Sequence, residues 1–155
     1  MNRRFALSAL ALLAAGAPAA WAKAPRAPLA TVTVYKNPSC GCCALWVEHL
    51  QEQGFATVVV EVPDTSEHRS RLGIPPSLAS CHTAQVEGYG LEGHVPASEI
   101  KALLARRPAI KALAVPGMPG NAPGMGPAVG PAFDVMQVDA QDKVSVFSRW
   151  PRRTP

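Results

Sequence analysis

The sequence has no run of basic residues and little charge of either sign. It contains 15 lysines and arginines and 11 aspartates and glutamates in 155 residues, so its formal net charge is only +4. A domain that binds nucleic acid usually gathers positive charge on one face, and this composition gives no reason to expect a nucleic-acid partner. The sequence also has no internal repeats, and its length suits a single domain.

No apolar run is long enough to cross a bilayer stably. The N-terminal apolar run covers residues 5–15 and is interrupted at Gly16, whereas a membrane-spanning helix needs about 20 mostly apolar residues. Arg3 and Arg4 precede this run and Ala20-Trp21-Ala22 follows it. This arrangement is typical of a cleavable secretory signal peptide.

We therefore predict that residues 1–22 are a signal peptide and that the mature protein is periplasmic, with no stable membrane anchor. Cleavage after Ala22 removes two arginines and no acidic residue, so the formal net charge falls from +4 to +2. Residues 23–30 are rich in proline and alanine, as is typical of a linker. An uncleaved anchor is the alternative, and the paired arginines leave the export route, general secretory or twin-arginine, open.

Cysteine is scarce and unevenly placed. Cys40, Cys42 and Cys43 lie within four residues, and Cys81 follows alone. Four cysteines in an exported protein usually form two disulfides. Three cysteines this close cannot all link distant parts of a chain, so the spacing favours metal binding or thiol exchange over structural disulfides.

The cysteine cluster lies at the predicted start of a helix. The free N–H groups and the dipole of a helix N-terminus favour thiolate over thiol. Redox exchange and metal ligation both need thiolate, so the location suits either chemistry. Cys40 and Cys43 have the dithiol spacing of thioredoxin-like enzymes, and Cys42 is an additional thiol between them.

Copper is the metal that the candidate ligands favour. Zinc sites usually use two separated pairs of cysteine or histidine, whereas thiolate and thioether ligands suit soft Cu(I). Met118 and Met125 are candidate thioether ligands, with loop packing as the alternative. His82 and His94 are candidate imidazole ligands, with a structural hydrogen-bonding role as the alternative for each.

The expected secondary structure follows the order of a thioredoxin-like α/β domain. Alternating β-branched residues predict a strand at 31–35, and an apolar stripe predicts the helix that begins at the cysteines. His49 on the polar face of that helix and His68 in a later turn are expected to be solvated. The further elements expected are a central strand at 57–62, a helical turn at 66–72, an extended segment at Ile74-Pro75-Pro76, a hairpin of strands at 83–86 and 89–91, and a helix opened by Pro96.

We place the thioredoxin-like domain at residues 31–107 and assign residues 108–155 to a C-terminal extension. The extension begins with a segment rich in glycine, proline and methionine and ends in a predicted hairpin of strands at 133–138 and 143–147. Glycine permits close backbone approach and proline limits chain freedom. We therefore expect the extension to lie over the cysteines and to contribute to the metal site.

Four segments, arriving in order, carry a resemblance to one protein family, and that resemblance covers nearly the whole mature chain. They are Tyr35-Lys36-Asn37-Pro38-Ser39-Cys40-Gly41-Cys42-Cys43 with Trp46-Val47, Ala79-Ser80-Cys81-His82-Thr83, Glu92-Gly93-His94-Val95-Pro96, and Ala114-Val115-Pro116-Gly117-Met118-Pro119. On these motifs the chain resembles the CopG-type periplasmic copper-resistance proteins.

The resemblance implies a thioredoxin-like domain with a cysteine-bridged copper cluster and a C-terminal extension that takes part in metal binding. It also implies a role in interconverting Cu(I) and Cu(II) in support of efflux. Copper ions and components of copper efflux are the partners that follow from it. The ligands that it implies are Cys40, Cys42, Cys43 and Cys81, with Met118 and Met125 from the extension.

Two other functions remain open at this point. One is a thiol–disulfide oxidoreductase that uses Cys40 and Cys43, although the third thiol of Cys42 would invite wrong pairings in such an enzyme. The other is a passive copper chaperone or buffer, which would need the same ligands as a copper oxidoreductase.

Overall fold

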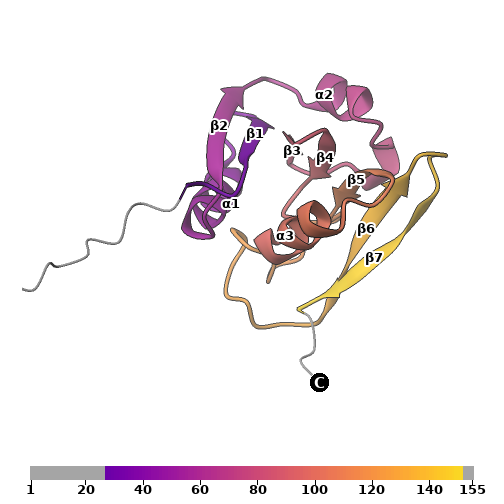
Figure 1. The fold of residues 1–155 in the computed structure, drawn as a ribbon. Helices are drawn as coiled ribbons and strands as arrows, with labels where there is room; N and C mark the ends of the chain where they lie inside the picture. Colours follow the sequence, from indigo (N-terminus) through magenta and orange to yellow (C-terminus); the bar gives the residue numbers. More distant parts are fainter. Residues whose placement is uncertain (1–26, 152–155) are drawn as a thin grey trace, which may run out of the picture.

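The strand predicted at 31–35 is observed as β1 (Thr31–Lys36), with Val32 and Val34 fully buried, as the period-two alternation requires. The computed structural model describes residues 27–151, which contain one seven-stranded mixed sheet in the order β2-β1-β3-β4-β5-β6-β7 (Figure 1). The strands after β1 are β2 (Ala56–Glu61), β3 (His82–Val86), β4 (Tyr89–Glu92), β5 (Ile110–Ala114), β6 (Phe133–Asp139) and β7 (Val144–Trp150).

The described residues begin after the predicted signal peptide. Residues 1–22, and the linker predicted at 23–30 up to residue 26, lie outside them. From residue 27 to residue 151, no helix has both the length and the apolar character that a membrane span needs.

The helices and apolar segments cover both faces of the sheet. The helices are α1 (Gly41–Glu52), α2 (Ser66–Arg71), α3 (Ala97–Arg106) and the short 3-10 helix η1 (Pro76–Leu78). Leu113 of β5 packs in the core with α1 and α3, whereas its neighbours Ala112 and Ala114 pack in a second cluster with Leu78 of η1. Successive strand residues point to opposite faces, so α1 and α3 lie on one face and the α2–η1 segment lies on the other.

The β3–β4 hairpin matches its sequence signal. Glu87 and Gly88 connect the two strands with φ angles of 45° and 89°. Positive φ at both central residues is the requirement of a tight two-residue hairpin turn, and glycine meets it without steric cost.

The prediction of a central strand at 57–62 is wrong. β2 is an edge strand that pairs only with β1 among the described strands, and Val58 and Val59 are 50% and 44% exposed. A run of β-branched residues favours any strand position. The sequence of β2 therefore does not show whether a second strand pairs with it on the side away from β1.

The sheet also continues past residue 107 through a strand that the sequence pattern did not predict. β5 pairs in parallel with β4, and the predicted C-terminal hairpin is observed as β6 and β7, which extend the same sheet (Figure 1). The extension therefore contributes three strands to the sheet.

The expectation that His49 and His68 are solvated is also wrong. His49 is half-buried, and its Nε2 accepts a hydrogen bond from the Ala97 N–H at the start of α3, with an N···N distance of 3.3 Å. The ring of His68 stacks on Tyr35 with centroids 3.8 Å apart. Both histidines lie among polar residues in the sequence, and each is half-buried in the fold.

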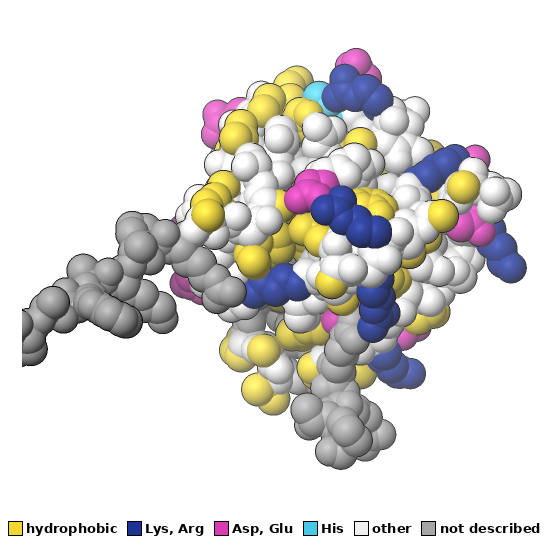
Figure 2. Space-filling model, in the orientation of Figure 1, with side chains coloured by type: hydrophobic (Ala, Val, Ile, Leu, Met, Phe, Trp, Pro, Cys, Tyr) yellow, Lys and Arg dark blue, Asp and Glu magenta, His cyan; other side chains and the backbone are white. Residues whose placement is uncertain are grey.

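Charged side chains are dispersed over the surface. On the face shown in Figure 2, lysine and arginine stand singly among acidic, neutral and hydrophobic side chains. Two ion pairs lie on the surface, Arg107–Glu87 and Lys111–Asp142, and each joins partly exposed side chains.

Candidate metal centre

The turn between β1 and α1 sets the position of the first three cysteines. The Asn37 side-chain oxygen accepts hydrogen bonds from the backbone N–H of Ser39 (2.9 Å) and from its hydroxyl (2.6 Å). Cys40 occupies the N-cap position of α1 with extended backbone angles, so Cys42 and Cys43 fall in the first helical turn. This is the location that the sequence predicted for them.

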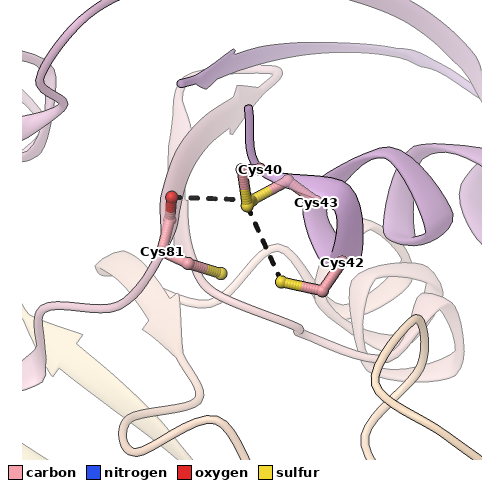
Figure 3. Close-up of side chains that lie close together, drawn as sticks. All are labelled: Cys40, Cys42, Cys43 and Cys81. Atoms are coloured by element: carbon pink, nitrogen blue, oxygen red, sulfur yellow. Dashed lines mark hydrogen bonds between the residues drawn. A yellow bond between two sulfur atoms is a disulfide. The ribbon is translucent and has the colours of Figure 1, made fainter. Parts of the chain in front are cut away.

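Two of these cysteines are bonded to each other. Cys40 and Cys43 form a disulfide, with Cα atoms 5.4 Å apart, while Cys42 and Cys81 are free thiols (Figure 3). The Cys42 Sγ atom lies 3.6 Å from the Cys40 Sγ atom. A free thiol is therefore in contact with a disulfide sulfur, which is the arrangement that thiol–disulfide exchange needs.

Strand pairing brings Cys81 to the same place. β1 and β3 are antiparallel, and Lys36 at the end of β1 faces His82 at the start of β3. The segment that leads to the cysteines and the segment that carries Cys81 therefore meet at one edge of the sheet, and the Cys43 Sγ atom lies 3.6 Å from the Cys81 carbonyl oxygen. All four cysteine sulfurs lie within 4.8 Å of one another.

The loop before β3 keeps both of its prolines in the trans form. The one cis peptide bond among residues 27–151 joins Trp150 to Pro151, so neither Pro75 nor Pro76 forms a cis-proline loop. The residues of this loop that lie beside the cysteine pair are Cys81 and its neighbours.

Both candidate histidines face Cys81. The His94 Nε2 atom lies 3.1 Å from the Cys81 Sγ atom, and the His82 Nδ1 atom lies 3.3 Å from it. The other ring nitrogen of His94, Nδ1, lies 2.7 Å from the Pro123 carbonyl oxygen. Because a carbonyl only accepts, this contact places the proton of the neutral ring on Nδ1 and leaves Nε2 with a free lone pair toward the sulfur.

Burial sets the protonation of these groups. Burial lowers the pKa of His82 to about 3, and repulsion between the two protonated rings of His82 and His94 acts in the same direction. Burial also lowers the pKa of His94. Burial, followed by the neighbouring Cys42, raises the pKa of Cys81 to about 12. The imidazoles are therefore neutral and able to bind a cation, whereas Cys81 is a protonated thiol that releases its proton when a metal binds.

The C-terminal extension contacts this site through its backbone. The Pro123 carbonyl oxygen accepts the hydrogen bond from His94 Nδ1. The next residue, Gly124, packs so closely on α1 that an added Cβ atom would lie 2.7 Å from the Trp46 backbone nitrogen and 2.9 Å from the Cys42 backbone oxygen. Met125, the following residue, is half-buried, whereas Met118 is 45% exposed. Ligation by either methionine stays a prediction.

The sequence analysis assigned no role to the polar residues behind Cys81. Glu92 is fully buried and interacts with Arg69, with the Ser80 backbone and with Thr83. A signal was present, since a glutamate within an otherwise apolar strand that precedes Gly93 and His94 needs buried partners.

Comparisons with known proteins place this site in a family context. A family model described as "Protein of unknown function, DUF411" matches residues 78–125, the stretch that contains Cys81 and both candidate histidines and methionines. No curated protein matches the sequence.

Two solved structures resemble the chain over most of its length. The structure titled "Copper resistance protein copG- Form 2" has a TM-score of 0.73 and 38% sequence identity, and the match covers 80% of this chain and 99% of that one. The structure titled "Copper resistance protein copG- Form 1" has a TM-score of 0.71 at the same identity, covering 79% and 98% of the two chains. Identity at this level over nearly the whole length of the relatives shows that the chain belongs to the family of CopG copper-resistance proteins.

Proposed function

We propose that this chain is a periplasmic copper-binding protein of copper resistance that holds copper ions on Cys40, Cys42, Cys43 and Cys81. The observation that carries the proposal is that four sulfurs from two separate segments lie within 4.8 Å of one another. Thiolates so close together can share soft ions, which favours Cu(I) over harder cations. Membership of a copper-resistance family supports the same metal.

Histidine and methionine donors extend the proposed site. The neutral ring nitrogens of His82 and His94 lie within reach of the Cys81 sulfur, so either imidazole can complete the coordination of an ion bound there. Met118 and Met125 are proposed as thioether ligands from the extension, whose backbone packs on α1 next to Cys42.

The disulfide gives the site a redox step. With Cys40 and Cys43 oxidised, only Cys42 and Cys81 are available as thiol ligands. We infer that the reduced pair transfers one electron to each of two Cu(II) ions. The products are two Cu(I) ions, the Cys40–Cys43 disulfide and two protons. The reverse transfer would oxidise Cu(I), and an external thiol reductant would restore the pair.

The fold supports this assignment. The first four strands have the order β2-β1-β3-β4, with β1 and β2 parallel and β3 antiparallel to both of its neighbours. A Cys-x-x-Cys disulfide at the start of the helix that follows β1 is the placement expected of a thioredoxin-like domain. We propose that residues 31–107 form such a domain and that residues 108–155 extend it over the metal site.

The second candidate function is thiol–disulfide exchange with protein substrates. The Cys40–Cys43 disulfide at the start of α1 favours it, because this spacing and this position are those of the reactive pair in dithiol enzymes. A passive copper chaperone or buffer would use the same ligands without the electron transfer.

The substitution Cys42→Ser separates these functions. It leaves the Cys40–Cys43 pair intact but replaces one thiolate with a hydroxyl, which binds Cu(I) poorly. We expect anaerobically reduced Cys42→Ser to bind fewer copper ions than the wild type by elemental analysis and to show weaker copper–thiolate absorption. Leu45→Ser, which changes an exposed side chain on the same helix, should leave both measurements unchanged.

The result that would contradict copper binding by all the thiols is full copper loading of Cys42→Ser. If that variant also reduced protein disulfides as fast as the wild type, exchange with protein substrates would be the better assignment.

A further inference from the structure

A buried ion pair lies directly behind the proposed ligands. Glu92, at the end of β4, is fully buried, and its Oε1 atom is 2.9 Å from the Nε atom of Arg69, whose side chain is 13% exposed. Of the three ion pairs found within residues 27–151, this is the buried one, since the other two join partly exposed side chains. Arg69 comes from α2 and also donates to the Thr65 hydroxyl at 2.9 Å.

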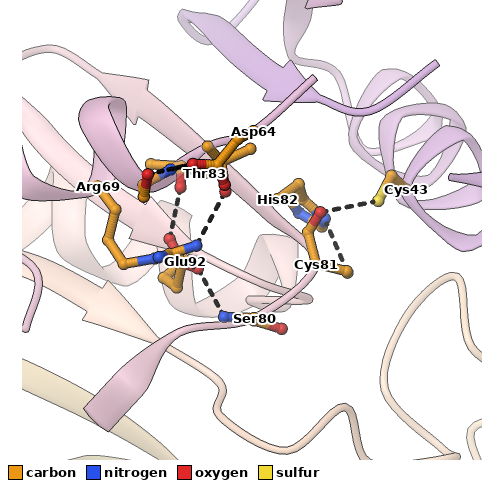
Figure 4. Close-up of polar contacts among 10 residues, drawn as sticks. Cys43, Asp64, Arg69, Ser80, Cys81, His82, Thr83 and Glu92 are labelled. Carbon is orange, nitrogen blue, oxygen red and sulfur yellow. Dashed lines mark hydrogen bonds and ion pairs between the residues drawn. The ribbon is translucent and has the colours of Figure 1, made fainter. Parts of the chain in front are cut away.

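The same carboxylate binds both residues that flank Cys81 and His82. Its Oε1 atom accepts the Ser80 backbone N–H at 2.7 Å, and its Oε2 atom accepts the Thr83 hydroxyl at 2.7 Å (Figure 4). One side chain therefore holds the chain immediately before Cys81 and immediately after His82.

We propose that Glu92 is a positioning residue of the metal site, which fixes the Cys81 thiol and the His82 imidazole toward the cysteines of α1. This inference rests on the proposed copper-binding function for its purpose. The contacts that carry it do not involve the metal.

The backbone around Glu92 links it to the third donor on this side of the site. Gly93 follows Glu92, has a φ of 67° and approaches Ser80 so closely that a Cβ atom would lie 2.7 Å from the Ser80 Cβ atom. His94 comes next and faces the Cys81 sulfur. Glu92 is thus hydrogen-bonded to Ser80 and Thr83, the residues on either side of Cys81 and His82, and is joined to His94 through the chain.

Burial makes this arrangement resistant to movement. A buried carboxylate that loses a donor cannot replace it with water, and a buried N–H group that loses its acceptor is equally costly. A shift of Ser80 or Thr83 would break such a contact, so the positions of Cys81 and His82 are tied to the ion pair. Replacing a buried ion pair with apolar residues often preserves stability, so a test must measure donor position and not stability alone.

The first test measures the Cys81 thiol without copper. When the Cys40–Cys43 disulfide is intact, Cys42 and Cys81 are the free thiols among the four cysteines of the chain, and peptide mass spectrometry separates their alkylation by iodoacetamide. Glu92→Gln keeps the side-chain size and removes the charge. It should speed alkylation of Cys81 by about tenfold or more, the ratio that follows from losing a hydrogen bond to a charged group. Glu87→Gln, which removes the exposed ion pair with Arg107, should leave the rate unchanged.

The second test loads anaerobically reduced protein with Cu(I). Glu92→Gln should lower the copper content and alter the copper–thiolate absorption as Cys81→Ser does. The double variant of Glu92→Gln and Cys81→Ser should lose no more copper than Cys81→Ser alone, because each substitution removes the Cys81 thiolate from the copper site.

The inference is overturned if folded Glu92→Gln alkylates Cys81 at the wild-type rate and gives the wild-type copper spectrum. Should Glu92→Gln fail to fold, Thr83→Val decides the question, since it retains the ion pair and removes one donor to the carboxylate. Faster Cys81 alkylation in Thr83→Val would support the inference, and an unchanged rate would refute it. A wild-type protein that bound no Cu(I) would refute the proposed function, while the alkylation rates would still test the role of Glu92.

Discussion

Replacing Gly124 with alanine tests whether the C-terminal extension depends on close packing against the helix that carries the cysteines. Gly124 has a φ of 83°, and an added Cβ atom would lie 2.7 Å from the Trp46 nitrogen, 2.9 Å from the Cys42 oxygen and 3.0 Å from the Trp46 Cα atom. All three are backbone atoms of α1 and cannot move aside by a rotamer change. The extension would have to move away from the helix.

Two costs contribute to the expected loss of stability. A side chain in the left-handed region costs roughly 1–2 kcal/mol, and overpacking of a closely packed contact costs typically about 1–3 kcal/mol. Gly117 provides a matched control, because its φ is 75° but no atom lies within 4 Å of its added Cβ atom. Gly117→Ala should therefore carry only the first cost. Gly124→Ala should be less stable than Gly117→Ala by about 1–3 kcal/mol.

Urea unfolding of the two variants and the wild type, followed by tryptophan fluorescence, measures the difference. Limited proteolysis should also cut residues 119–130 faster in Gly124→Ala, and Cu(I) affinity should fall because Pro123, which holds His94, is the preceding residue. If the two alanine variants were equally stable and equally resistant to proteolysis, the close packing of the extension on α1 would be refuted.

Three further predictions address the ligands, export and pH. The double substitution of Met118 and Met125 by alanine should weaken Cu(I) binding or change the copper spectrum while leaving the unfolding midpoint nearly unchanged; an unchanged affinity and spectrum would leave loop packing as the role of both residues. N-terminal sequencing of the periplasmic fraction should begin at Lys23, whereas a full-length chain in the membrane fraction would refute cleavage. Burial lowers the pKa of His49 below its usual 6.5, so the unfolded chain binds a proton first on acidification. The stability advantage of the wild type over His49→Gln should therefore shrink as the pH falls below about 6.5; a constant difference would contradict this.

The local pattern of the sequence was sufficient for most elements. The strand at β1, the helix after the cysteines, the hairpin with Glu87 and Gly88 at its turn, and the C-terminal hairpin were all predicted, because alternation, helical stripes and turn residues act over a few neighbours. The position of β2 at the edge and the existence of β5 were not, since a short apolar segment is compatible with several pairings. His49 shows the same limit, because its polar helix face becomes covered only when α3 packs beside it.

For the candidate site, too, the sequence determined one part and the tertiary structure another. The sequence by itself determined the chemistry available: three cysteines at a helix start, an isolated cysteine beside a histidine, and a glycine- and proline-rich segment with two methionines. It also carried enough similarity to indicate the family. These properties belong to residue types and to spacing within short segments, which can be read without coordinates.

Tertiary structure decided how these groups meet. The antiparallel pairing of β1 with β3 brings Cys81 to the α1 cysteines across about forty residues of chain, and the docking of the extension places the Pro123 carbonyl on His94. The Arg69–Glu92 ion pair forms behind Cys81 because α2 packs beside β3, the strand that pairs with β4. Strand pairing and burial between segments far apart in sequence produce these contacts, and neither leaves a periodic pattern in the residues that make them.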